Sequence, residues 1–521
     1  MSLNLSNLLI DSGRLHAERT ALVLGDDSLT YAQLLDRVEH FAGALRALGL
    51  ERGDKVALML PNVPEFTVAY FGALFVGCPV VPLNVLLTPA EVAYHLEDSD
   101  AVALVAWSGF AQSASAGFER VAGCRELIVA GPAADASEGH AMEALTTAAS
   151  PVVDPVATSP DDTAVVLYTS GTTGRPKGAE LSHFNLFYNA DYVRSTLLPM
   201  PAEDAVALAT LPLFHSFGQT VIQNRFLMGG GKVVLLPRFS ASAALEAMAR
   251  HGVTFFAGVP TMYVAMLAHE SAEPHDLSRF SCCVSGGAAM PVDVLNAFEQ
   301  RYGVPILEGY GLSETSPVAC FNSLDRPRKP GSIGTPIGGV RFRLLADDGS
   351  VVEEPGVPGE ICIKGHNVMK GYYNKPEATA EVLQDGWFRT GDVGTRDGDG
   401  YYTIVDRKKD MIIRGGFNVY PREIEEVLYA HPAVEEVAVI GLPHPSHGEE
   451  VCAVVVLRKG ESVSESEIRA HCRTELAAYK YPRVVRIVAS LPKGPTGKIL
   501  KREIRVLQGG ETAAVAAPAH A

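Results

Sequence analysis

The sequence contains few residues that could build a disulfide framework or a metal centre. Eight cysteines are scattered through 521 residues, and no two form a CxxC pair or stand at the spacing of metal ligands. They are Cys78, Cys124, Cys282, Cys283, Cys320, Cys362, Cys452 and Cys472. Scattered cysteines are typical of a reducing compartment, so we expect a cytoplasmic protein.

Long hydrophobic runs are also missing. The longest, residues 69–83, is interrupted by glycines and prolines and is shorter than the ~20 residues that span a bilayer. The first ten residues lack the basic flank, apolar core and cleavage site of a signal peptide. We therefore expect no transmembrane segment and at most peripheral membrane contact.

Positive charge is scarce relative to negative charge. Forty-four Lys and Arg residues against sixty Asp and Glu give a formal net charge of −16. Such a field repels nucleic acid, so we expect no nucleic-acid partner and local capture of any phosphate ligand. The composition is that of a folded soluble protein, and a chain of this length exceeds what one hydrophobic core supports.

Alternating helix and strand patterns fill the first third of the chain. Thr30 and Gln33 form a capping box ahead of a helix, and apolar runs at 55–60 and 79–82 predict strands around a second helix, 65–76. Alternation of this kind predicts an α/β fold with a largely parallel sheet and ligands beyond its carboxyl strand ends. The composition of residues 131–162 predicts a surface connection that carries no catalytic or binding residues.

The densest group of chemical functions is the stretch YTSGTTGRPKG at residues 168–178. It follows an apolar strand-like run, its glycines can turn backbone N–H groups toward an anion, and its lysine suits terminal phosphates. It lacks the Gly-Lys-Ser/Thr ending of a Walker A loop. The stretch predicts a polyphosphate cradle made of Thr169, Ser170, Gly171, Thr172, Thr173, Gly174 and Lys177.

This cradle resembles the phosphate-binding signature of the adenylate-forming superfamily, which comprises acyl-CoA synthetases, carrier-protein adenylation domains and beetle luciferases. The likeness covers nearly all of the chain and is strongest to bacterial medium- or long-chain fatty acid–CoA ligases. It implies a large N-terminal α/β domain, 1–406, with mostly parallel sheets flanked by helices. A small mobile α+β domain, 407–521, would follow a hinge at about 407–410 and end in a disordered tail, 512–521.

Further motifs extend the resemblance to the nucleotide site. The segment SGGA at 285–288 opens a turn after a short strand, and EGYGLSETSP at 308–317 places glycines beside an aromatic ring on which a purine could stack. The resemblance implies that Glu314 holds Mg²⁺ and that Asp392 accepts the ribose hydroxyls. The implied nucleotide contacts are Gly287, Ala288, Gly309, Tyr310, Gly311, Ser313, Asp392 and Arg407.

The acyl pocket and the small domain are identified in the same way. The resemblance implies a pocket of His215, Phe217, Gly286, Gly309 and Pro317, and a catalytic group of Lys498, Glu314 and His215. A lone histidine is more often a packing residue, so His215 receives no proton-transfer role. Residues 406–425 resemble the interdomain hinge segment, with Lys409 as the pivot and Gly415 and Gly416 beside the coenzyme A channel.

The expected activity is ATP-dependent ligation of a carboxylic acid to coenzyme A through an acyl-adenylate, with release of AMP and pyrophosphate. ATP, Mg²⁺ and coenzyme A are the expected cofactors and co-substrates, and a homodimer is possible. A medium- or long-chain fatty acid is favoured over an aryl acid such as a cinnamate or benzoate. The alternatives are loading of a carrier protein, a luciferase-like oxidation, and a non-enzymatic scaffold that retains the fold.

Overall fold

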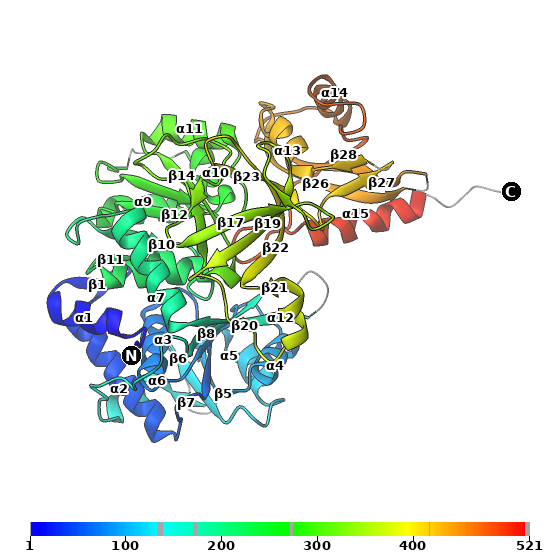
Figure 1. The fold of residues 1–521 in the computed structure, drawn as a ribbon. Coiled ribbons are helices and arrows are strands. Elements are labelled where there is room, and N and C mark those ends of the chain that lie inside the picture. The colour runs from blue at the N-terminus through cyan, green and yellow to red at the C-terminus, as the bar shows by residue number, and fades with distance from the viewer. Residues whose placement is uncertain are drawn as a thin grey trace.

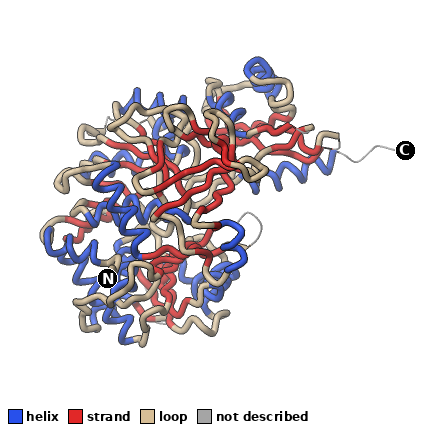
Figure 2. Tube along the Cα trace, viewed as in Figure 1, coloured by secondary structure: helices blue, strands red, loops and turns tan. Residues whose placement is uncertain are grey.

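The computed structural model describes residues 2–132, 139–169, 175–270, 275–415, 417–444 and 446–515. Strands gather in the interior of each part of the molecule, and most helices lie on the outside (Figures 1 and 2). The α/β fold expected from the sequence is observed. Within the described ranges, no helix combines the length and the apolar character needed to cross a membrane.

Two large sheets carry most of the N-terminal part. The first runs in the order β16 (Thr335–Pro336), β15 (Val318–Phe321), β14 (Ile306–Gly311), β13 (Cys282–Ser285), β12 (Phe255–Gly258), β10 (Val206–Ala209), β11 (Lys232–Leu235), β1 (Thr20–Leu24), β2 (Asp27–Thr30). The second runs in the order β20 (Gly371–Tyr372), β9 (Lys177–Ser182), β8 (Thr163–Thr169), β4 (Val80–Pro82), β3 (Lys55–Met59), β5 (Ala101–Trp107), β6 (Glu126–Ala130), β7 (His140–Ala141). The inner strands of both sheets pair in parallel, as the alternating pattern predicts.

Helices pack around these two sheets. They are α1 (Asn7–Leu15), α2 (Tyr31–Ala47), α3 (Pro64–Phe75), α4 (Pro89–Asp98), α5 (Ala111–Phe118), α6 (Met142–Ala148), α7 (His183–Tyr192), α8 (Arg225–Met228), α9 (Ala241–His251), α10 (Pro260–Ala268), α11 (Val292–Tyr302) and α12 (Pro376–Val382), with short turns η1 (Ser108–Phe110), η2 (Val193–Leu197), η3 (Gly218–Asn224) and η4 (Ser313–Thr315). One hydrophobic core joins both sheets through α2 and α3, where Phe41, Phe66 and Phe71 are fully buried.

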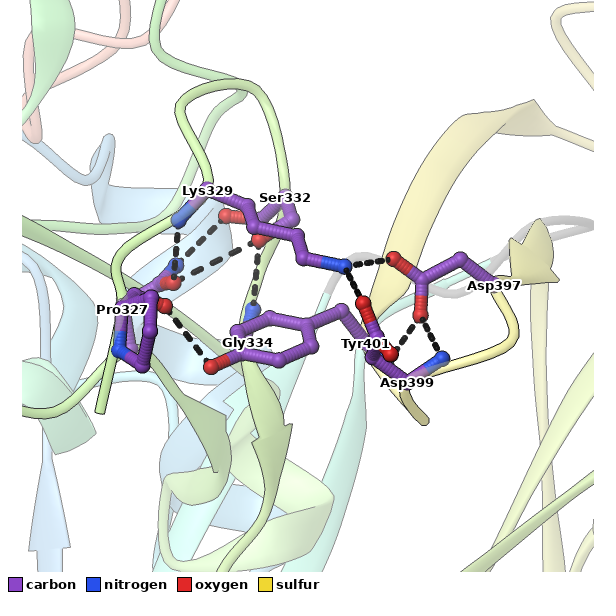
Figure 3. Close-up of polar contacts among 8 residues, drawn as sticks. Pro327, Lys329, Ser332, Gly334, Asp397, Asp399 and Tyr401 are labelled. Carbon is purple, nitrogen blue, oxygen red and sulfur yellow. Dashed lines mark hydrogen bonds and ion pairs between the residues drawn. The ribbon is translucent and has the colours of Figure 1, made fainter.

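A third, antiparallel sheet lies beside the first. Its order is β18 (Val351–Val352), β17 (Val340–Leu345), β19 (Gly359–Gly365), β22 (Trp387–Arg396), β21 (Leu383–Gln384), with β23 (Tyr402–Arg407) paired to β22. Lys329 links it to the first sheet by ion pairs with Asp397 and Asp399, and the Tyr401 hydroxyl donates to the Pro327 carbonyl at 2.7 Å (Figure 3). These contacts join the turn between β22 and β23 to the segment between β15 and β16.

The last part of the chain has cores of its own. Strands β25 (Phe417–Val419), β24 (Ile412–Arg414), β27 (Gly448–Leu457) and β26 (Val434–His444) form a sheet, and β28 (Val484–Ile487) pairs with β27. Helices α13 (Pro421–Tyr429), α14 (Glu465–Glu475) and α15 (Lys501–Val515) cover it (Figure 1). The two core clusters here draw only on residues from Ile412 onward. The domain boundary at residue 406 stays a prediction.

Local sequence signals succeed in some places and fail in others. The Thr30–Gln33 capping box is present, with both reciprocal hydrogen bonds, and begins α2. Residues 131–162 are more structured than expected, because β7 and α6 lie within them. The expected disordered tail, 512–521, stays a prediction, because α15 is described to Val515 and residues 516–521 lie outside the described part.

The connection after α6 packs directly on α2. A Cβ atom on Gly43 would lie 1.9 Å from the Ser150 carbonyl oxygen. Gly43→Ala should therefore lower the free energy of unfolding by about 1–3 kcal/mol through overpacking, although alanine favours a helix by about 1 kcal/mol over glycine. Urea unfolding followed by circular dichroism measures the shift in midpoint.

Gly123→Ala is the matched control, because nothing lies within 4 Å of a Cβ at that position. An unchanged midpoint for Gly43→Ala would show that the segment around Ser150 moves aside without cost.

Candidate functional site

Glu314 joins the two large sheets at the site. It lies in η4, just after β14 of the first sheet, and is 7% exposed. Its Oε1 accepts hydrogen bonds from the Thr169 hydroxyl at the end of β8 and from the Tyr372 hydroxyl in β20, both at 3.1 Å. A carboxylate from one sheet is thus fixed by two hydroxyls from the other.

The described part of the cradle lies beside this carboxylate. Lys177 begins β9, and its Nζ lies 5.3 Å from the centre of the Tyr372 ring. The expected donors Ser170, Gly171, Thr172, Thr173 and Gly174 lie outside the described residues. The structure therefore brings Thr169 and Lys177 together with Glu314, and the role of the cradle stays a prediction.

A second polar group surrounds the buried Asp392 carboxylate. The Tyr310 hydroxyl, from β14, donates to Asp392 Oδ2 at 2.6 Å, and Arg407 Nε lies 3.2 Å from Oδ1. Burial and the Asp392 charge raise the pKa of Tyr310 well above its usual value, so the phenol stays protonated. An ionised carboxylate has about four lone-pair sites, which leaves Asp392 able to accept the ribose hydroxyls as well.

The small domain reaches this group through the loop that carries Lys498. Gly497, at φ +78°, lies against α10, where the Thr261 hydroxyl donates to the Gly497 carbonyl at 2.9 Å. Burial and the Arg407 guanidinium lower the pKa of the half-buried Lys498 to about 8. Burial and the Lys498 charge in turn lower the pKa of His215 to about 4, so His215 is neutral at physiological pH. Lys498 therefore lies near both His215 and the Asp392–Arg407 pair.

Helix α13 provides a second contact between the small domain and the rest of the chain. Arg422 donates to the Ile404 carbonyl at 2.7 Å and the Gly331 carbonyl at 3.3 Å, and the Val292 N–H donates to Glu426 at 3.5 Å. The small domain is thus docked at two separate places, the Lys498 loop and α13.

The residue before Lys409 is attached to the N-terminal part of the chain, and the residue after it is attached to the small domain. The Lys408 N–H donates to the Gly391 carbonyl at 2.9 Å, in the N-terminal part. The Asp410 carboxylate lies 3.0 Å from Arg505 of α15, in the small domain. Lys409 is the one residue between these two attachments, which supports its predicted role as pivot.

Several expected glycines have packing reasons that the sequence does not show. A Cβ on Gly309 would lie 2.4 Å from the Phe321 ring, and one on Gly311 would lie 1.6 Å from the Pro317 carbonyl oxygen. A Cβ on Gly286 would lie 3.1 Å from the Phe217 ring, so these two expected pocket residues are in contact. Room for a ligand is therefore not what requires glycine at 309 and 311.

Other expected positions are more open. Gly287 and Ala288 are exposed, and the nearest atom to a Cβ on Gly287 is 3.6 Å away. Ser313 is half-buried at the start of η4, and Pro317 is buried behind it. Gly415, at φ +60°, donates to the His447 carbonyl at 2.8 Å, and Gly416 lies outside the described residues.

Sequence reasoning missed Tyr372 and Thr261. Both act by one hydroxyl across a large sequence separation, 58 residues from Tyr372 to Glu314 and 236 from Thr261 to Gly497. Neither residue stands in a motif with chemical content. No local signal could have found them.

The chain is similar to known proteins along most of its length. Residues 11–373 match the family described as AMP-binding enzyme, and residues 423–498 match the AMP-binding enzyme C-terminal domain. A long-chain-fatty-acid–CoA ligase of Bacillus subtilis (strain 168) is 36% identical over 537 residues, covering 96% of this chain and 94% of that protein. A feruloyl-CoA synthase of an Amycolatopsis species is 41% identical over 493 residues, covering 94% and 96%.

Solved structures show the same likeness. The anthranilate CoA ligase AuaEII, in complex with anthranoyl-AMP, superimposes with a TM-score of 0.92 at 29% identity, covering 98% of each chain. The resemblance predicted from the motifs is confirmed over nearly the whole chain.

The hydrogen bond between Thr261 and Gly497 allows a direct test of how the Lys498 loop is held against α10. Thr261→Val keeps the side-chain shape but removes the donor, which should weaken docking by about 1 kcal/mol, or roughly fivefold in population. Hydrogen–deuterium exchange of the amides at 494–498 should rise accordingly.

Thr146→Val is the matched control, because its hydroxyl also donates to a backbone carbonyl, at 2.7 Å, but within α6. Equal exchange of the 494–498 amides in both variants would mean that the Thr261 hydroxyl does not hold the loop.

Proposed function

We propose a two-step reaction for this chain, which belongs to the AMP-binding enzyme family and is an acid–thiol ligase. In the first step the substrate carboxylate attacks the α-phosphate of ATP, the acyl-adenylate forms and pyrophosphate leaves. In the second step the coenzyme A thiol attacks the acyl carbonyl and AMP leaves. Coenzyme A is preferred to a carrier protein as acceptor because the relatives reported above are named as CoA ligases or synthases.

The position of Lys498 carries the assignment of the first step. Two anions, carboxylate and polyphosphate, must approach each other, and a cation beside them offsets their repulsion as charge develops. Lys498 lies near Arg407 and Asp392 while its loop is docked on Thr261. We assign this docked arrangement to adenylate formation, with Tyr310 under the adenine and Asp392 on the ribose.

A magnesium ion fits the surroundings of Glu314. Mg²⁺ typically takes one or two protein carboxylates and completes its shell with phosphates and water. Among the residues that the structure describes, no three His, Cys, Asp or Glu side chains gather as a metal site. One carboxylate oriented by two hydroxyls suits an ion that arrives with ATP, whose charge the ion would neutralise. Glu314 would hold it, and Thr169 and Tyr372 would orient Glu314.

The second step requires another arrangement of the small domain. Lys408 and Asp410 are attached to different bodies, so a change of backbone angles at Lys409 would rotate the small domain without breaking either attachment. Gly415 and Gly416 would then border the coenzyme A channel. The proposal keeps the cytoplasmic location and the possible homodimer expected from the sequence.

The acid is a fatty acid or an aryl acid in this proposal. Relatives of both kinds are similar to this chain, one named for long-chain fatty acids and one for ferulate. The contact of Phe217 with Gly286 supplies an apolar wall that either class could use.

Lys498→Ala should slow single-turnover adenylate formation by roughly 10²–10³-fold, the usual loss for one well-placed electrostatic donor. Formation of acyl-CoA from supplied acyl-adenylate should be nearly unchanged, because the docked lysine serves only the first step. The matched control is Lys493→Ala, in the same loop, whose ammonium pairs with Glu436. Adenylation by Lys498→Ala at the wild-type rate would remove Lys498 from the mechanism.

The lowered pKa of Lys498 predicts an alkaline limit on the first step. The ammonium is present below pH 8 and is lost as the pH rises through about 8, so kcat/KM for ATP should fall above that pH. Lys498→Arg keeps its charge to much higher pH and should shift the limit upward, even where its absolute rate is lower. The measurement is the pH profile of kcat/KM for both enzymes, and an identical alkaline limit in both would assign the limit to another group.

A further inference from the structure

A buried helix next to His215 carries a stripe of polar side chains. Ser216, Gln219, Thr220, Gln223 and Asn224 follow one another at alternating intervals of three residues and one residue along the helical segment that includes η3. This spacing places them on one side of the helix. Each is at most 1% exposed. We call these five residues the buried polar stripe.

The far end of the stripe has partners on α3 and within the stripe. The Thr67 hydroxyl donates to Gln223 Oε1 at 2.8 Å, and Gln223 Nε2 donates to Asn224 Oδ1 at 3.5 Å. The Asn224 side chain also lies beside the Tyr70 hydroxyl of α3, but Asn224 Nδ2 and that hydroxyl have no hydrogen-bond partner among the described residues. Gln223 therefore uses both ends of its amide inside the protein.

The near end has no such partners. Ser216 Oγ, Thr220 Oγ1 and both amide atoms of Gln219 are buried without a hydrogen-bond partner among the residues that the structure describes. Buried polar groups are almost always hydrogen-bonded in native proteins, so a cluster of four unpaired atoms requires an explanation. The π-helical geometry of η3 also points to a functional role, because π segments inside helices occur frequently at functional sites.

The near end adjoins the proposed acyl site. The Gln219 N–H donates to the His215 carbonyl at 3.0 Å, and Phe217, between them, contacts Gly286. Gln219 and Thr220 follow His215 by four and five residues, about one turn of helix. His215 in turn lies near Lys498.

The chemistry of the four atoms selects the group that would satisfy them. A glutamine amide offers two N–H donors and one acceptor oxygen, and each hydroxyl can donate or accept, so an uncharged hydroxyl, which also does both, complements them. A second carboxylate or a sulfonate would lack a counter-charge. Arg225, the next residue on the helix, donates to the Leu198 carbonyl at 2.6 Å and lies over the Phe226 and Phe255 rings, while its Nε has no hydrogen-bond partner among the described residues. An unsubstituted alkyl chain would leave all four atoms unpaired.

We propose that the substrate acid carries an uncharged hydroxyl group that binds Ser216, Gln219 and Thr220 at the inner end of the acyl pocket. This inference rests on the proposed function and narrows it, since a plain fatty acid would satisfy none of the three residues. Gln219 acts here as a specificity-determining residue, and the reacting carboxylate remains at the Lys498 end.

The test compares acids of matched shape in the wild-type enzyme. The panel is cinnamic acid, 4-hydroxycinnamic acid, 4-methylcinnamic acid, 4-carboxycinnamic acid and dodecanoic acid, each scored by kcat/KM for acyl-CoA formation. The hydroxy acid should exceed its methyl and unsubstituted analogues by at least about tenfold, because an analogue without the hydroxyl leaves the buried polar groups unpaired. Equal values, or a preference for dodecanoic acid, would overturn the inference while leaving the ligase function in place.

Gln219→Leu provides an independent measurement. It should reduce the ratio of the hydroxy acid to the methyl acid to near one, whereas Gln223→Leu, at the paired end of the stripe, should leave the ratio unchanged. If Gln219→Leu leaves the ratio of the hydroxy acid to the methyl acid unchanged, Gln219 is not a specificity-determining residue. If the variant does not fold, the wild-type panel alone tests the inference. Absence of acyl-CoA and of ATP–pyrophosphate exchange with every acid would instead count against the proposed function and, with it, this inference.

Discussion

The buried carboxylate of Asp392 is the interaction on which the arrangement of the site depends. It accepts from Tyr310, which belongs to the first sheet, and pairs with Arg407, which ends the third sheet just before the hinge. A buried charge of this kind is stable only when its partners are in place, so the three residues fix one another. In the proposed mechanism the same carboxylate would set both the nucleotide position and the start of the small domain.

The local electrostatics are opposite in sign to those of the whole chain. The formal net charge is −16, yet Arg407 lies close enough to Lys498 and Lys409 to lower the pKa of both, in addition to the larger effect of burial. Like charges held together in a partly buried site are unfavourable without an anion. The free protein therefore holds cationic groups whose mutual repulsion a bound polyphosphate would relieve, which is how a strongly acidic protein can still bind ATP.

The two ends of the proposed acyl site differ in a similar way. Near Lys498 the groups are charged or, in His215, kept neutral by burial, whereas Ser216, Gln219 and Thr220 are uncharged and unpaired. A substrate with a carboxylate at one end and a hydroxyl at the other would match both. The same helix supplies both environments because His215 stands just before its first turn.

Local chemistry in the sequence was enough to predict the alternating α/β pattern and the capping box at Thr30, and the resemblance of its motifs to a known family implied Glu314, Asp392, Arg407 and Lys498 as site candidates. Helix caps and apolar periods act over a few residues, and the motifs are short, so each can be read without knowing the fold. The sequence could not show that Tyr372 and Thr169 hold Glu314, that Thr261 receives the Lys498 loop, or that Phe321 requires glycine at 309. It also could not show that the Gln223 amide is hydrogen-bonded while the side chains of Ser216, Gln219 and Thr220 are not. Each of these is a contact between segments far apart in the chain, and only tertiary packing decides which atoms meet.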